Sequence, residues 1–199
     1  MTMQGLSIGV ANAIYHRRSI RSYTGAAITA EELQDLLKAA IQAPTAQHEE
    51  CWAFIVVQDK PLLHRISGVV KQHMLDRLPT TVQDDDPHVL ALRSPNFDVF
   101  HGAGNLILIC GPRLGRFVAA DCWLAAENIM LLAHAMGLGS CVIGSVLEVL
   151  NREFATSLGL SADMDFHVAL SIGVPLEVPA HSPRRPPVIL GHFPPVSED

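Results

Sequence analysis

The chain of 199 residues carries 20 acidic and 14 basic side chains, which gives a formal net charge of -6. With a sequence pI near 5.9, such a chain is poorly suited to the phosphate backbone of nucleic acids, so we expect no DNA or RNA partner. Because 49% of the residues are hydrophobic and only 17% are charged, we expect one domain over residues 1–199 with a substantial core and apolar surface that favours self-association.

Neither a signal peptide nor a membrane span is predicted. Residues 1–14 lack a basic n-region, and the longest uncharged stretch, residues 128–147, contains asparagine, histidine, serine and several glycines. The sequence has no C-x-x-C pair, and three of its four cysteines lie in apolar runs, which is typical of reduced, buried thiols. We therefore expect a cytoplasmic protein without disulfides.

The first predicted helix starts near Val10 and runs into a basic cluster over residues 16–23, His-Arg-Arg-Ser-Ile-Arg-Ser-Tyr. In this cluster Arg17, Arg18 and Arg21 surround Ser19, although the chain as a whole is acidic. Donors this close together can bind several oxygens of one phosphate, through charge-assisted hydrogen bonds of about 1.5 to 3 kcal/mol each. The alternative is the solvated end of a helix, which many basic clusters are.

A helix and a strand are expected next. Thr29 and Glu32 have the spacing of a capping box, and apolar residues then recur at helical intervals until Pro44. The compact apolar run over residues 52–57 predicts a buried strand.

The following segment is harder to assign. Asp59 and Pro61 open a predicted helix that runs through Ile66. Residues 74–96 contain three consecutive aspartates and several prolines, so they predict a mobile excursion that is either a lid or a disordered segment.

The second half of the chain alternates strands and helices. Residues 106–110 predict a buried strand, and residues 119–136 predict a helix that is central to the core or to a subunit interface. That helix is apolar nearly all round, with polar exceptions at Glu127, Asn128 and His134. Ser145 and Glu148 suggest a capping box for another helix, which runs to Gly159, and residues 166–172 alternate as a strand.

The tail from Pro175 is rich in proline and must be extended, so it is expected to lie on another surface. Together these elements predict an α+β fold, with a mostly antiparallel central sheet surrounded by helices.

Other common sites are disfavoured. Gly137 and Gly139 follow a predicted helix instead of a strand, which argues against a dinucleotide fingerprint, and Leu138 stands where a nucleophile elbow around Ser140 needs glycine. A metal-dependent enzyme centred on His48 and its two glutamate neighbours remains a weak alternative.

Several motifs occur in the order typical of one family. Residues 17–23 and residues 43–52, Ala-Pro-Thr-Ala-Gln-His-Glu-Glu-Cys-Trp, resemble the opening of the nitroreductase family. Residues 137–144, Gly-Leu-Gly-Ser-Cys-Val-Ile-Gly, the Gly-Val-Pro turn at 173–175 and the paired arginines 184–185 resemble its later signatures. The likeness spans nearly the whole chain.

This resemblance implies a homodimer that binds FMN in a cleft between its subunits, with NAD(P)H as reductant and an extended C-terminal arm that crosses to the partner. It assigns the phosphate and ribityl end of the flavin to Arg17, Arg18, Ser19, Arg21, Arg184 and Arg185. It assigns the ribityl and ring region to Pro44, Thr45, Ala46, Gln47 and His48, and the central ring to Ile143 and Gly144, with no catalytic nucleophile of the protein.

The second motif departs from the family pattern, which usually has Asn, Gln and Pro at the positions of His48, Glu50 and Cys51. These changes alter charge and hydrogen bonding where the flavin is expected. The leading hypothesis is ping-pong hydride transfer from NAD(P)H through flavin N5 to a nitroaromatic, quinone or similar flat acceptor. The alternative is an FMN-binding protein that stores or senses the flavin with little turnover.

Overall fold

A computed structural model describes residues 9–191 except 80, 82, 84 and 181. Within these residues the helices are α1 (Val10–His16), α2 (Ala30–Ala40), α3 (Lys60–Asp76), α4 (Pro87–Arg93), α5 (Val118–Ala135) and α6 (Leu147–Val149), with short turns η2 (Ala46–His48), η3 (Gly144–Val146) and η4 (Leu150–Phe154). The strands are β1 (Ala53–Val57), β2 (Asn105–Pro112), β3 (Gly139–Val142) and β4 (Met164–Gly173), and they form one sheet in the order β1-β2-β4-β3.

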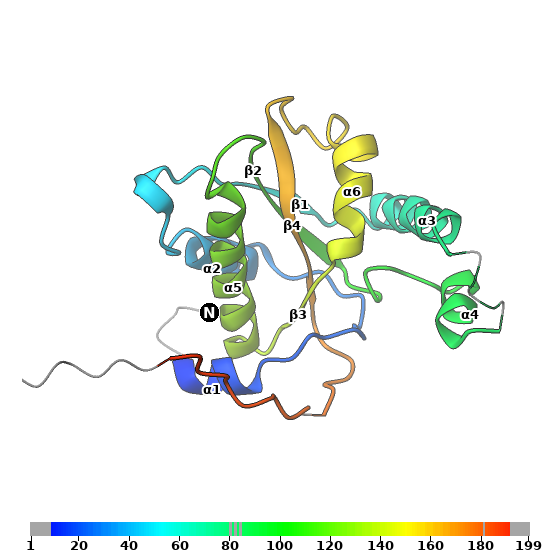
Figure 1. Cartoon of the computed structure of the whole chain (residues 1–199), viewed down its shortest axis with the longest axis horizontal. Coiled ribbons are helices and arrows are strands. Elements are labelled where there is room, and N and C mark those ends of the chain that lie inside the picture. The colour runs from blue at the N-terminus through cyan, green and yellow to red at the C-terminus, as the bar shows by residue number, and fades with distance from the viewer. Residues whose placement is uncertain (1–8, 80, 82, 84, 181, 192–199) are drawn as a thin grey trace, which may run out of the picture.

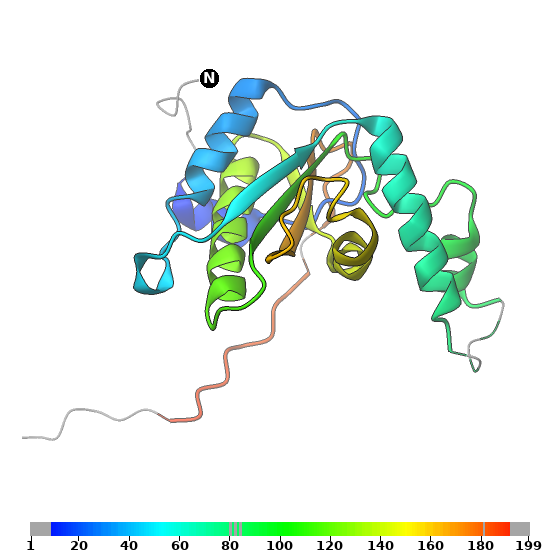
Figure 2. The same ribbon diagram turned by 90° about the horizontal axis from the view of Figure 1, so that it is seen from above.

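All three strand pairings are antiparallel, which confirms the predicted α+β class. Figures 1 and 2 show α1, α2 and α5 on one side of the sheet and α6 and α3 on the other. Each face carries its own apolar cluster, one built around α2 and α5 and the other around α3 and α6. The central strands β2 and β4 face both clusters, so Leu106, Ile107, Leu108 and Ile109 are completely buried.

The expectation of a buried first strand needs correction. β1 is present at the expected place, but four of its five residues are only half-buried. It lies at an edge of the sheet and pairs with β2 alone, so one side of its backbone has no neighbouring strand. Its apolar composition did not distinguish an edge strand from a central one.

The residues after α1 run along the other edge of the sheet. Ser19 forms a parallel bridge with Ser140 of β3, and the Ile20 N–H donates to the Ser140 carbonyl at 3.0 Å. Gly139 allows this approach, because a Cβ atom there would lie 2.7 Å from the Ile20 side chain. Tyr23 forms an antiparallel bridge with Pro175, so the basic cluster is tied to the segments before and after the last strand.

The excursion after β1 is more ordered than predicted. α3 continues to Asp76, and α4 lies within the segment that was expected to be a lid or disordered. Val89 and Leu92 of α4 are buried, and the Lys71 ammonium donates to the Ser94 carbonyl at 2.6 Å. Figure 2 shows α3 and α4 beside each other, well away from α1. A role for this segment as a lid stays a prediction.

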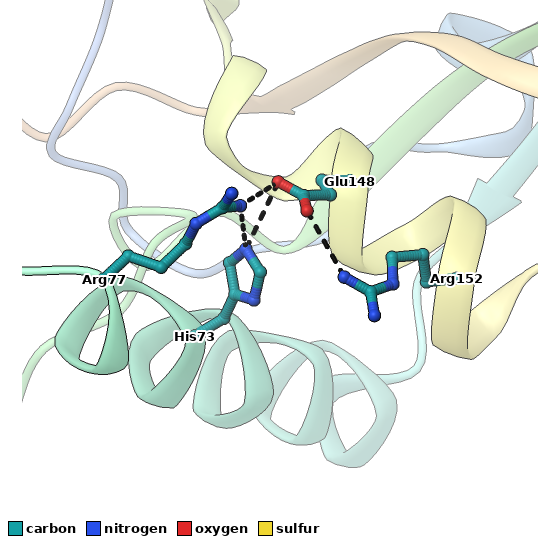
Figure 3. Close-up of polar contacts among 4 residues, drawn as sticks. All are labelled: His73, Arg77, Glu148 and Arg152. Carbon is teal, nitrogen blue, oxygen red and sulfur yellow. Dashed lines mark hydrogen bonds and ion pairs between the residues drawn. The ribbon is translucent and has the colours of Figure 1, made fainter.

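The predicted capping box at Ser145 is also wrong. α6 begins without a side-chain cap, because Glu148 is used elsewhere. As Figure 3 shows, its carboxylate contacts His73 of α3, whose Nε2 is at 3.3 Å, Arg77 directly after α3, and Arg152 of η4 at 3.4 Å. Desolvation raises the pKa of Glu148, but the hydrogen bonds and positive charges of Arg77 and His73 together outweigh it and hold this pKa below its usual range. The cluster therefore links α3 to the α6 region.

The described residues of the arm 174–191 form no helix or strand apart from the bridge at Pro175, as the prolines predict. The expectation that this arm lies on another surface is not met within one chain. The arm overlaps α1 in Figure 1, but Figure 2 shows that it extends away from the helices and the sheet, and Val188, Ile189 and Leu190 are exposed. Across the part of the chain that the structure describes, no helix is both long and apolar enough to cross a membrane.

Candidate functional site

A cavity of about 510 Å³ opens where the basic cluster meets the C-terminal arm. It brings together five of the predicted residues, Arg17, Arg18, Ser19, Arg21 and Arg184, and none of the described residues that line it is a carboxylate. The arm also contributes Ser182, and α1 contributes Tyr15. Residues far apart in the sequence thus form one strongly cationic wall.

The local backbone explains how these side chains are presented. α1 ends at His16, and Arg17 has extended dihedral angles, so the chain turns toward β3. The Arg18 guanidinium donates to the carbonyls of Tyr15 at 2.9 Å and Arg17 at 2.7 Å, where the end of a helix leaves carbonyls without partners. This fixes Arg18 at the mouth of the cavity.

The other two arginines keep donors free. The Arg17 Nε atom is buried without a hydrogen-bond partner, and its nearest carboxylate oxygen, on Glu127, is 3.8 Å away. Arg21 is exposed and forms no hydrogen bond or ion pair with the described residues. Unsatisfied guanidinium donors around a cavity without carboxylates fit a phosphate group, which offers several acceptor oxygens.

His101 adjoins this cluster with a left-handed backbone, φ 58°. Burial and the positive charge of Arg21 lower the pKa of His101, while Asp98 opposes the shift. The sequence analysis did not identify this histidine, because no motif links it to Arg21.

The second predicted motif occupies the turn between α2 and β1. Gln47, His48 and Glu50 all have positive φ angles, which are costly for residues other than glycine. The turn is held by Asp121 in the first turn of α5, whose two carboxylate oxygens accept from the Ala46 N–H at 3.2 and 3.3 Å. Pro44, Gln47 and His48 are exposed, while Thr45 and Ala46 are half-buried.

Asp121 is the residue that the sequence analysis missed. It is 4% exposed in a mainly apolar helix, whose other polar residues are Glu127, Asn128 and His134. An acidic residue in the first turn of such a helix was a readable signal, because a buried carboxylate needs a donor.

The two motifs lie at opposite ends of α5 within one chain. Asp121, which holds the second motif, is in the first turn, whereas His134, beside Arg17 and Arg18, is in the last. Thirteen residues of α-helix correspond to about 20 Å. The single chain therefore does not bring Pro44 to His48 next to the basic cavity.

Ile143 and Gly144 follow β3, on the sheet edge that carries the basic cluster. The Ile143 N–H already donates to the Ala169 carbonyl at 2.9 Å. Gly144 is exposed, starts the η3 turn and therefore has no acceptor within that turn for its N–H. Of the two predicted residues, Gly144 is the one with a free backbone donor.

Arg185 is exposed and is not part of the cavity lining. Burial raises the pKa of Cys110 to about 11 and that of Cys122 to about 12, so both thiols stay protonated. Among the described residues no three His, Cys, Asp or Glu side chains gather in a way that could hold a metal ion.

The fold and the cavity define an α+β protein with a cationic cavity between the end of α1 and the C-terminal arm. Comparison with known proteins makes this specific, because the nitroreductase family model matches residues 14–174. The chain belongs to the nitroreductase family.

Three similar proteins illustrate this membership. "Putative NADH dehydrogenase/NAD(P)H nitroreductase" from Archaeoglobus fulgidus is 30% identical over 168 residues, 81% of this chain and 83% of that protein. "FMN reductase (NADPH)" from Bacillus subtilis is 26% identical over 90% of this chain and 71% of its own length. A nitroreductase from Bacteroides fragilis, solved with bound FMN, is 25% identical, has a TM-score of 0.72, and is matched over 96% of this chain and 100% of that chain.

Proposed function

We propose that this chain is an FMN-dependent NAD(P)H oxidoreductase that passes hydride through flavin N5 to a nitroaromatic, quinone or similar flat acceptor, in a ping-pong cycle. Family membership supports the class of reaction, and the FMN named for relatives supports the cofactor. The observation that carries the proposal is the cavity lined by Arg17, Arg18, Ser19, Arg21 and Arg184, to which the described part of the chain contributes no carboxylate.

In this proposal the residues of the chain bind and orient. The guanidinium groups of Arg17 and Arg21 and the Ser19 hydroxyl hold the flavin phosphate, and Arg184 closes over it from the arm. The backbone N–H of Gly144, at the start of η3, would donate a hydrogen bond to the flavin ring. Bound FMN supplies the hydride acceptor and donor, so no side chain acts as a nucleophile.

The proposal includes a homodimer. Because Pro44 to His48 lie about one α5 length from the basic cavity, both motifs reach one flavin when the second comes from the partner subunit. The apolar side chains of Trp123 and Leu124 on α5 are 44% and 45% exposed, which supports a contact between subunits on this helix. Crossing of the arm to the partner is part of the same proposal.

The departures at His48 and Glu50 place a titratable ring and an acidic group on the exposed face of the second motif. Both groups would stand beside the acceptor in the dimer. We propose that they select acceptors without added negative charge, since a carboxylate repels anions.

The purified protein tests the proposal in two stages. Flavin absorption of the isolated or FMN-supplemented protein is expected first, and a preparation that stays colourless with added FMN contradicts the cofactor assignment. Stopped-flow mixing with NADPH or with NADH is then expected to reduce the flavin, which is seen as a loss of its absorption as fast as catalytic turnover. A quinone added afterwards is expected to reoxidise the flavin and restore the absorption. Bound flavin that neither nucleotide reduces would favour the storage or sensing alternative.

A further inference from the structure

A second cavity of about 270 Å³ lies next to the basic cavity and shares Arg17 and Arg18 with it. His16 and His134 also line it, so four of its side chains are cationic or can become so. Within the part of the chain that the structure describes, no acidic residue lines it, and its other walls are apolar or glycine apart from Ser140. This concentration of positive charge has no counter-charge inside the cavity.

One polar group at this cavity lacks a hydrogen-bond partner. The Arg17 Nε atom is buried and has none among the described residues, although a carboxylate oxygen of Glu127 lies 3.8 Å away. Buried donors are normally satisfied, so an acceptor in the cavity would complete this one.

The charged groups around His134 also favour an anion in this cavity. His16, Arg17 and Arg18 face it from α1 and the residues after it, and the arm contributes the uncharged Pro175 and Val178. On its own helix, the carboxylate of Glu127 lies two turns earlier and pairs with Arg17. Burial first, and then these three cationic neighbours, lower the pKa of His134.

We propose that this second cavity is an anion site that binds a phosphate monoester group while FMN occupies the neighbouring cavity. The inference rests on the proposed function only in assigning the first cavity to FMN. The group can come from two sources, the 2′-phosphate of NADPH or free inorganic phosphate. A bound anion favours the protonated imidazole, so binding takes up a proton at His134 and strengthens as the pH falls, by at most about tenfold per pH unit for one proton.

The test uses the FMN-loaded protein, after flavin absorption has shown that FMN is bound. Titration calorimetry with inorganic phosphate, 2′-AMP and adenosine is run between pH 6.5 and 8.5, above the second phosphate pKa of about 6. We expect both phosphates to bind and adenosine not to bind, with proton uptake revealed by buffers of different ionisation heat. If 2′-AMP binds and competes with NADPH the source is the nucleotide, and if only inorganic phosphate binds the source is the free ion.

A matched pair of variants assigns the effect to the cavity. His134→Gln is expected to abolish the proton uptake and to flatten the pH dependence of phosphate binding. His88→Gln, at an exposed histidine of α4, is expected to leave both unchanged. Absence of phosphate binding to the FMN-loaded protein overturns the inference. Displacement of FMN by phosphate also overturns it, because the two cavities would then be one site. A protein that takes up no FMN at all contradicts the proposed function instead, and the same titration of that protein still tests the anion site.

Discussion

Arg21 is the residue whose environment most directly predicts a ligand contact. It borders the basic cavity and has no hydrogen bond or ion pair within the described chain, so its guanidinium is free for a phosphate. We expect Arg21→Ala to weaken FMN binding by at least about 1.5 kcal/mol, the loss of one hydrogen bond to a charged group. Fluorescence titration of FMN measures this. Arg65→Ala, an exposed arginine on α3, serves as control, and equal affinity of both variants would place Arg21 outside the site.

Two histidines make the stability of the FMN-free protein depend on pH. The pKa values of His101 and His134 are both lowered, chiefly by burial, so the unfolded chain binds more protons than the folded chain near and below the ordinary histidine pKa of 6.5. The free energy of unfolding is therefore expected to fall as the pH drops from 7.5 to 5.5. Urea unfolding at several pH values measures the slope.

His101→Gln removes one of these groups and is expected to make that slope shallower. Glu148 and Asp163 also have shifted pKa values, but theirs are lowered from the carboxyl range, so their effect belongs below about pH 4.5. A free energy of unfolding that rises as the pH drops from 7.5 to 5.5 would contradict this prediction.

At the scale of single residues, the sequence predicted the basic cluster that lines the cavity better than the residues that support it. Arginines around a serine are visible in the sequence because the chain is otherwise acidic, and Arg184 was recognised by resemblance. Asp121 and His134 were not assigned roles, because their importance depends on which segments pack against α5. That information lies in the tertiary structure.

At the scale of elements, the turn that carries the second motif depends on one carboxylate. Asp121→Ala would leave the Ala46 N–H without its acceptor beneath three residues with positive φ. We expect a loss of about 1 to 3 kcal/mol in the free energy of unfolding, as for other buried groups left unsatisfied.

Asp121→Asn is the matched control for this prediction, since its amide oxygen still accepts from Ala46. We expect it to retain most of the stability. Urea unfolding of both variants measures the difference. An alanine variant as stable as the parent would show that the turn does not depend on the Asp121 carboxylate.

Elements with a strong hydrophobic periodicity were predicted well. Elements whose structure depends on contacts with distant segments were not. The capping box at Thr29 forms as expected, with the Glu32 carboxylate accepting from the Thr29 N–H at 2.7 Å. The similar pattern at Ser145 fails, because Glu148 gains charged partners on α3. α4 was missed because its seven residues are too short to show a clear period, although Val89 and Leu92 bury well.

At the scale of the whole molecule, the exposed apolar residues on α5 predict self-association. We expect the parent protein to be a dimer and Trp123→Glu to be a monomer, because a charge would be buried in the contact. Light scattering after size exclusion measures both masses. Leu90→Glu is the control, since Leu90 is 55% exposed on α4, far from α5 (Figure 2). A parent protein with the mass of one chain would contradict the proposed dimer.

The pairing of residues 19–24 with Ser140, Val174 and Leu176 has a consequence for biosynthesis. Translation releases the amino end first, so the arginine cluster leaves the ribosome long before the strand and turn that hold it in place. Flavin capture must then wait until almost all of the described chain has been made. Nascent or prematurely terminated products that stop short of residue 174 would lack these supports and would not compete with finished molecules for the cellular flavin pool.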